Sequence, residues 1–381
     1  MIRLLAVAAI SSAVLSACVG EPAASPSPST TAATRLTITD KTKPEIEAVL
    51  RARQQALARK DLKAFQATVD LARPAFRRCQ QEDFDIASRI GAPADGPRVA
   101  KVEPYGDSYL RAYVEDGPSD LSRMYFRRDG DRWILTEPRI EELGGERSRT
   151  VFGVRIDYWG IDEDIVDIAA RDAAETRDYI KPYANGPIKD PYSVKLIPTR
   201  EAAGIVACIF TAFMNTLDEH SPFIAVRRLW LAPSLDRLSD GMRAILHHEG
   251  FHYLQDQFSH RITVRLDWWL VEGWPDYVAR TSSLGAIEYS LCLANVPPLK
   301  RIIDGVPTEP DTPAELTAQF YALANTMVEY VYATYGPRTY WDLVALYKEN
   351  TDYRVNYPQI FKVEPATFYE RWLAYAKQKY C

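Results

Sequence analysis

Apolar residues follow two different spacings in the first half of the chain. Between Lys43 and Asp70 they recur at helical intervals, which predicts an amphipathic helix. Its apolar positions include Ile46, Val49, Leu50, Leu57, Leu62 and Phe65. From Arg98 to Pro138 short alternating segments are broken by turn signals, which predicts an antiparallel meander. The turn signals are Tyr105-Gly106-Asp107, Asp116-Gly117-Pro118 and Asp129-Gly130-Asp131.

A second region of mixed pattern begins near Ser148. Strands are predicted at 152–160, 193–198 and 223–233, and a helix is predicted at 161–184. Beyond Ser239 the apolar spacing is mostly helical up to the C-terminus. Strands first and helices afterwards predict an α+β fold with a small sheet and a mostly helical C-terminal part. We therefore expect two folded domains, at 35–147 and 148–381.

The first residues have the pattern of an export signal. Arg3 precedes an apolar run from Leu4 to Leu15, which is too short to span a bilayer but suits the core of a signal peptide. The sequence LSAC that ends at Cys18 resembles the lipobox of bacterial lipoproteins, although an ordinary secretory signal with a chance cysteine is the alternative. The resemblance implies a signal peptide at 1–17 and lipidation of Cys18 with fatty acids such as palmitate. It also implies that the protein is lipid-anchored in the cell membrane and faces outside the cytoplasm.

The residues after Cys18 are rich in Pro, Ser, Thr and Ala, so 18–34 is expected to be a disordered linker.

The remaining cysteines are Cys79, Cys208, Cys292 and Cys381, which allow three disulfide connectivities and form no CxxC pair. The formal net charge is -5, and no run of lysine or arginine appears. Nucleic acid is therefore not an expected partner.

The segment HHEGFH holds three of the chain's five histidines. Within it, His248 to His252 match H-E-x-x-H, and Ser239 or Asp240 can cap a helix that carries the motif. Positions four apart lie on one face of a helix, so His248 and His252 can bind one metal ion while Glu249 reaches a water bound to it. The motif therefore predicts a metal site.

A catalytic zinc site needs a third protein ligand. Glu272 follows His252 by twenty residues, and Asp276 lies on the same helical face and could accept a hydrogen bond from a ligand histidine. Asp267 and His260 are the other candidates for the third ligand. A metzincin site is excluded, because positions 255 and 258 hold glutamine and phenylalanine where that class needs glycine and histidine.

These motifs resemble the gluzincin clan of zinc peptidases, and the peptidase MA-like group of exported bacterial proteins in particular. The resemblance covers about residues 150–350 and includes the glutamate signature EGWPDY and the segment QFYALANTMVEYVYATYG. It implies a zincin-like domain in which His248, His252 and Glu272 bind Zn²⁺ and Glu249 is the general base. It also implies that Tyr321 stabilises the oxyanion, and that the strand at 223–233 is the edge strand that pairs with a substrate.

The preceding domain resembles nuclear transport factor 2 in its order of helices and antiparallel strands. Two positions depart from the gluzincin pattern: Gly250 lies in mid-helix, and Pro275 is expected in the first turn of the helix that carries Glu272. The resulting hypothesis is a membrane-anchored, extracytoplasmic zinc metallopeptidase that acts on a peptide or protein substrate. The alternative is an inactive zincin-fold lipoprotein with a binding or envelope role.

Overall fold

The computed structural model describes residues 36–90, 96–115, 119–203, 212–215, 223–227, 229–259, 266–306 and 314–381. The chain divides into two compact units. Among the described residues, the N-terminal unit contains those between 36 and 143 together with 199–203, and the C-terminal unit contains the others. The division falls at Leu143, slightly before the boundary expected at 147. The expected signal peptide, Cys18 and the linker lie outside the described residues.

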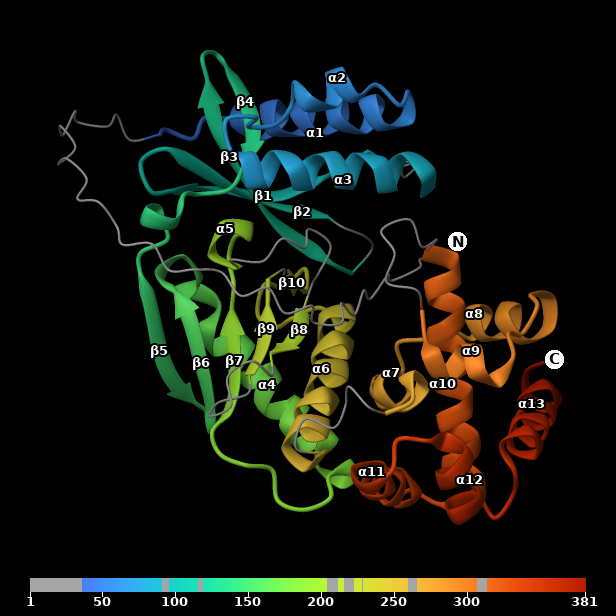
Figure 1. The fold of residues 1–381 in the computed structure, drawn as a ribbon. Helices are drawn as coiled ribbons and strands as arrows, with labels where there is room; N and C mark the ends of the chain where they lie inside the picture. Colours follow the sequence, from blue (N-terminus) through green and yellow to red (C-terminus); the bar gives the residue numbers. More distant parts are fainter. Residues whose placement is uncertain are drawn as a thin grey trace, which may run out of the picture. The chain divides into compact units, whose positions relative to one another are not determined.

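The N-terminal unit packs helices on an antiparallel sheet (Figure 1). Its strands pair in chain order, all antiparallel, so the predicted meander is confirmed. The turns at Gly106 and Gly130 both use the positive φ that glycine adopts readily. The elements of this unit are α1 (Thr42–Ala58), α2 (Leu62–Gln66), α3 (Pro74–Ile90), β1 (Val99–Tyr105), β2 (Tyr109–Glu115), β3 (Leu121–Asp129), β4 (Arg132–Thr136) and the short α5 (Arg200–Ala203).

The helical region predicted from Lys43 to Asp70 contains two helices, α1 and α2. Lys60 has a left-handed backbone with φ 54°, which ends the first helix. The Asp61 side chain then accepts a hydrogen bond from the Ala64 N–H and caps α2. Local capping therefore overrides an apolar spacing that continues across the break.

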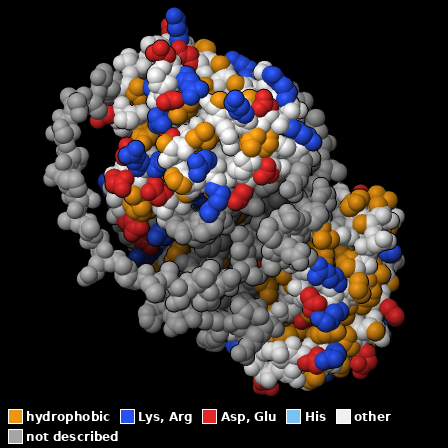
Figure 2. Space-filling model, turned by 45° about the horizontal axis from the view of Figure 1, so that its top comes forward, with side chains coloured by type: hydrophobic (Ala, Val, Ile, Leu, Met, Phe, Trp, Pro, Cys, Tyr) orange, Lys and Arg blue, Asp and Glu red, His pale blue; other side chains and the backbone are white. Residues whose placement is uncertain are grey.

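The N-terminal unit buries its own apolar core, to which α1 contributes Ile46 and Leu50 and the sheet contributes Phe126 and Trp133. Basic and acidic side chains are interspersed on the face of this unit that Figure 2 shows. Exposed ion pairs of this kind, such as the one between Arg132 and Asp129, add little stability. The packed interior accounts for most of the stabilisation.

The sheet of the C-terminal unit has the strand order β5-β6-β7-β9-β8 (Figure 1). Its strands are β5 (Glu146–Val151), β6 (Val154–Trp159), β7 (Tyr192–Leu196), β8 (Ala212–Asn215) and β9 (Phe223–Val226). The pairs β6-β7 and β7-β9 are parallel, whereas β5 and β8 pair antiparallel with the strands inside them.

The prediction of a single edge strand at 223–233 was wrong in two respects. The segment consists of β9 and a separate β10 (Trp230–Leu231), and β9 lies inside the sheet rather than at its edge. The edge strand on this side of the sheet is β8, which pairs antiparallel with β9. A strand as short as β8 shows too little alternation to be recognised from its sequence.

Helices make up the rest of the C-terminal unit. α4 (Val166–Ile180) and α6 (Asp240–Ser259) pack against each other and against strands of the sheet. Ser239 caps α6 by accepting a hydrogen bond from the Met242 N–H at 3.2 Å, as one of the two predicted caps. The others are α7 (Trp268–Ala279), α8 (Leu284–Glu288), a π-helical turn (Tyr289–Leu293), α9 (Leu299–Asp304), α10 (Ala314–Tyr335), α11 (Thr339–Glu349), α12 (Tyr353–Phe361) and α13 (Pro365–Tyr380). The unit is therefore α+β, as predicted.

Two mid-helix glycines mark close approaches between elements. A Cβ on Gly250 of α6 would lie 2.9 Å from the Tyr192 hydroxyl of β7 and 3.0 Å from a methyl of Thr176 in α4. A Cβ on Gly273 of α7 would lie 2.7 Å from the Ala324 carbonyl oxygen of α10. Glycine costs about 1 kcal/mol in a helix relative to alanine, and here it permits packing that a larger residue would prevent.

The C-terminal residue is held by a disulfide between Cys292 and Cys381. Cys79 is also disulfide-bonded. In the described part of the chain, no helix has both the length and the apolar character needed to cross a membrane.

Gly273→Ala is expected to destabilise the C-terminal unit by about 1–3 kcal/mol, because the new methyl group meets the backbone of α10 rather than a movable side chain. Urea unfolding followed by tryptophan fluorescence measures this change. The control is Gly96→Ala, since the nearest atom to a Cβ there is 4.0 Å away. An unchanged urea midpoint for Gly273→Ala would mean that α7 and α10 can move apart without loss of stability.

Candidate metal centre

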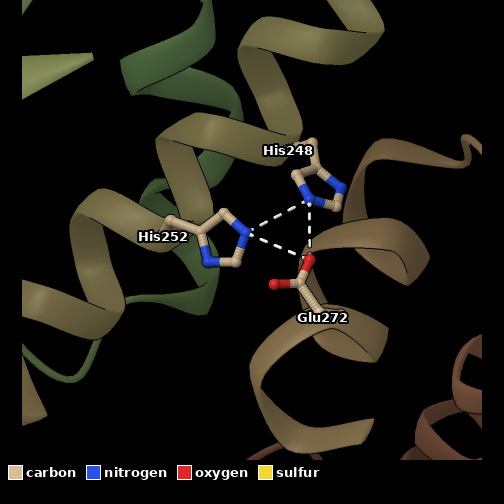
Figure 3. Close-up of side chains that lie close together, drawn as sticks. All are labelled: His248, His252 and Glu272. Atoms are coloured by element: carbon tan, nitrogen blue, oxygen red, sulfur yellow. Dashed lines mark hydrogen bonds and ion pairs between the residues drawn. The ribbon is translucent and has the colours of Figure 1, made fainter. Parts of the chain in front are cut away.

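Two helices of the C-terminal unit bring three side chains together. His248 and His252 lie one turn apart on α6, and Glu272 lies on α7, which packs against α6. The two histidine Nε2 atoms are 3.2 Å apart, and each is 3.5 Å from Glu272 Oε2. In Figure 3 both imidazole rings and the carboxylate point toward one another.

The triangle formed by these three atoms has the size of a metal site. A divalent ion bound tetrahedrally by imidazole nitrogen and carboxylate oxygen at about 2.0–2.2 Å separates neighbouring ligand atoms by about 3.3–3.6 Å. The observed separations of 3.2 and 3.5 Å agree with this range within a tenth of an ångström. Among the described residues, these three side chains form the group that can hold a metal ion.

Burial makes the charges of this group strongly dependent on one another. Burial alone raises the pKa of Glu272, but the charge of His252 and hydrogen bonds from both histidines outweigh it and hold that pKa well below its usual range. Burial likewise lowers the pKa of His252, and the charge of Glu272 reverses the effect and raises it to about 9. The carboxylate therefore requires a positive partner, which a bound cation supplies when both imidazoles are neutral.

Glu249 is buried next to the three ligand candidates and interacts electrostatically with all of them. Burial raises its pKa, while the charges of His252 and His248 oppose the increase. The backbone of Met214 in the edge strand β8 also stabilises the ionised carboxyl and opposes the increase. The motif's glutamate therefore lies between the candidate metal ligands and the edge of the sheet.

Tyr321 of α10 lies in the same site. Its hydroxyl donates a hydrogen bond to Glu272 Oε2 at 3.0 Å, and its ring packs edge to face against Trp268 with centroids 5.1 Å apart. Burial and the neighbouring Glu272 raise the pKa of Tyr321 well above its ordinary value, so the hydroxyl keeps its proton. It is therefore available as a hydrogen-bond donor inside the site.

Asp276 does not make the hydrogen bond to a ligand histidine that the sequence predicted. Its carboxylate accepts hydrogen bonds from Thr281, Ser282 and Asn325 instead. The His248 Nδ1 atom is buried and has no hydrogen-bond partner. The helical spacing places Asp276 on the right face, but three other donors at the end of α7 and on α10 occupy its oxygens.

The other candidate ligands lie elsewhere or outside the described residues. Asp267 immediately precedes α7, where it accepts a hydrogen bond at 2.7 Å from Tyr357, and it is not part of the metal group. His260 lies outside the described residues. His247 stacks on Tyr179 with ring centroids 4.0 Å apart and is likewise not part of the metal group. Glu272 is therefore the third member of the group.

Sequence reasoning missed two contributors and misplaced a third. Pro275 lies well inside α7 rather than in its first turn, because the helix begins at Trp268. Gln255 contacts His252, with 2.6 Å between its Oε1 atom and His252 Nδ1, whereas from the sequence alone it served only to exclude the metzincins. Its position three residues after the second histidine was the available signal. No sequence pattern indicated a role for Met214. The pairing of β8 with β9 is what brings its backbone close to Glu249.

No family model matches the chain, and no curated protein matches it.

The buried Asp267 at the start of α7 is expected to make stability depend on pH. Burial raises the pKa of Asp267 to about 6, despite a hydrogen bond from Tyr357. Below about pH 4 this carboxyl is neutral in both the folded and the unfolded chain. Between about pH 4 and 6 only the unfolded chain ionises, so the wild type should lose on the order of 2–3 kcal/mol relative to Asp267→Asn as pH rises.

Urea unfolding of both proteins between pH 4 and 8 gives this difference directly. The control is Asp342→Asn, which replaces an exposed carboxylate in the same unit. A difference between the wild type and Asp267→Asn that stays constant over this range would mean that Asp267 is ionised at every pH tested.

Proposed function

We propose that this protein is a zinc metallopeptidase of the gluzincin type that hydrolyses peptide bonds. The observation that carries the proposal is the triangle of His248, His252 and Glu272 with Glu249 buried beside it. Two imidazoles and one carboxylate are the donor set of catalytic zinc sites, which leave a fourth position open. A structural zinc site has four protein ligands, and no fourth ligand joins this group among the described residues.

Zinc, when bound, lowers the pKa of water to about 7 and polarises a substrate carbonyl as a Lewis acid. Glu249 accepts a proton from the attacking water and then returns it to the leaving amine. Burial raises the pKa of this carboxyl toward neutrality, which suits a group that must both take and release a proton. The Tyr321 hydroxyl, whose single proton otherwise bonds Glu272, would turn to donate it to the oxygen that becomes negative as the water attacks.

The substrate we propose is an extended peptide that adds to the edge strand β8. The Ile197 N–H donates to the Val226 carbonyl of β9, so Val226 and Ile224 direct their backbone groups toward β7. The pair of Met214 and Ile224 therefore exchanges no ladder hydrogen bonds. The backbone groups of Met214 therefore face away from β9, toward the side where a further strand can pair. A peptide bound there would lie next to Glu249, the proposed base.

The proposal also includes the fold family of each unit and the location of the protein in the cell. The C-terminal unit is proposed to be zincin-like, and the N-terminal unit to be related to nuclear transport factor 2. We also propose that Cys18 carries the lipid that anchors the protein outside the cytoplasm, where its peptide or protein substrate would lie.

The full chain is expected to bind one zinc per molecule, and Glu249→Gln should keep the zinc while losing peptide hydrolysis. A glutamine cannot accept the proton, although it has nearly the shape of glutamate. Elemental analysis measures the zinc, and fluorescein-labelled casein together with a mixture of quenched fluorescent peptides measures hydrolysis. Glu272→Ala should lose the zinc as well as the hydrolysis, because a catalytic site cannot spare a ligand.

The control for Glu272→Ala is Glu288→Ala, which removes an exposed glutamate in the same unit. If the wild-type protein binds zinc but shows no hydrolysis above that of Glu249→Gln, the peptidase proposal is contradicted. That result would support the alternative, a lipoprotein with a binding role. Folded wild-type protein that takes up no zinc would contradict both.

Tyr321→Phe should retain zinc and lower kcat by roughly 100-fold to 1000-fold, as expected when one donor to the oxyanion is removed. Zinc content and turnover are measured separately, because the same hydroxyl also donates to Glu272. The control is Tyr330→Phe, a buried tyrosine on the same helix. Unchanged turnover in Tyr321→Phe would remove Tyr321 from the mechanism.

A further inference from the structure

Gln255 connects the two helices that carry the candidate metal ligands. It lies on α6 and its side chain is fully buried, with 0% exposure. Its Oε1 atom lies 2.6 Å from His252 Nδ1, and its Nε2 atom donates to the carbonyl oxygens of Leu270 at 3.1 Å and Val271 at 2.9 Å in α7. One side chain therefore contacts a ligand on α6 and the backbone that precedes Glu272 on α7.

The two carbonyls determine which way the Gln255 amide points. An amide nitrogen can only donate and a carbonyl can only accept, so Nε2 must face Leu270 and Val271. The Oε1 atom therefore faces His252, and the hydrogen bond at 2.6 Å requires a proton on Nδ1. A neutral imidazole with its proton on Nδ1 has its free lone pair on Nε2, which is the atom that points into the metal triangle.

Pro275 explains why a carbonyl of α7 needs a donor from outside its own helix. In a regular helix the N–H of residue 275 would donate to the carbonyl of Val271, and proline has no N–H. The Gln255 amide donates to that carbonyl. Proline would otherwise leave a buried acceptor without a partner, which is costly in a helix one residue before a metal ligand.

We propose that Gln255 is a positioning residue that orients His252 for metal binding and holds α7 in place by donating to the carbonyl that Pro275 leaves free. This proposal rests on the metal site of the proposed function, but it does not require that the protein cleave peptides. It joins three features of the sequence, the second histidine of the motif, Gln255 and Pro275, into one arrangement.

Gln255→Met tests the positioning of His252, because methionine fills a similar volume without any of the three hydrogen bonds. Gln257→Met is the matched control, since Gln257 is buried on the same helix and also bonds two backbone groups, the Lys189 N–H at 3.0 Å and the Pro187 carbonyl at 2.8 Å. Zinc affinity is measured on the full chain by competition with a chelating indicator. The visible spectrum after loading with cobalt reports the geometry at the metal.

The expected result is a 10-fold to 100-fold loss of zinc affinity and an altered cobalt spectrum in Gln255→Met alone, the size of effect seen when a group that supports a ligand is removed. Equal zinc affinity in Gln255→Met, Gln257→Met and the wild type would overturn the proposal. If Gln255→Met does not fold, Gln255→Asn replaces it, because the shorter amide cannot reach both helices. Zinc affinity and the cobalt spectrum are then measured on Gln255→Asn, with the same loss expected and the same equality overturning the proposal.

The link to Pro275 has its own test, which needs no zinc. In Pro275→Ala the new N–H can bond the Val271 carbonyl, so Gln255→Met should lower the urea midpoint less in that background than in the wild type. Equal losses in the two backgrounds would overturn this half of the proposal.

Failure of the proposed function is distinguishable from failure of this inference. Wild-type protein that binds zinc but cleaves nothing would contradict the peptidase, while a loss of zinc affinity in Gln255→Met would still support the positioning role. Wild-type protein that binds no zinc would overturn the positioning role together with the peptidase.

Discussion

A buried carboxylate that faces two imidazole nitrogens is the constraint on which the arrangement of the C-terminal helices depends. Removing Glu272 from water is expensive unless a positive charge compensates it, and the two histidines converge on the same oxygen. The compensation works only if α6 and α7 stay at a separation that keeps all three atoms within a few ångströms. The close packing of α7 against α6 and α10 maintains that separation.

Features that weaken a helix in isolation are what allow this packing. Gly250 lets α6 approach β7 and α4, and Gly273 lets α7 approach the backbone of α10, from which Tyr321 reaches the Glu272 carboxylate. Pro275 removes a hydrogen-bond donor from α7, and Gln255 of α6 supplies one. The local losses are therefore compensated by contacts between helices, and these contacts are concentrated next to the metal triangle.

The candidate metal site also lies close to the edge strand β8 of the sheet. Glu249 lies on the helix that carries two of the candidate ligands, and the backbone of Met214 in the edge strand stabilises its ionised carboxyl. The candidate base and the edge of the sheet are thus neighbours, and the proposed peptidase function relies on this arrangement. The charges of His252 and His248, together with the Met214 backbone, oppose the rise in the pKa of Glu249 that burial produces.

The sequence by itself determined the parts of this protein that depend on local spacing. The positions of His248 and His252 one turn apart, the cap at Ser239 and the meander of the N-terminal unit all follow from periodicity and turn chemistry, and the structure has them where they were predicted. Glu272 was predicted from its distance along the chain and from resemblance, and α7 brings it to the two histidines. Local spacing works here because a helix turn or a hairpin needs no information from distant residues.

Only the tertiary structure decided how groups from separate elements pair. The spacing of Asp276 from Glu272 suggested a partner for a histidine, yet Thr281, Ser282 and Asn325 take its oxygens, and Gln255 rather than an aspartate supports His252. The edge strand proved to be β8 and not β9, since strand order depends on how the chain returns through the sheet. Periodicity gives the face on which a side chain lies, whereas its partner depends on which other elements pack against that face.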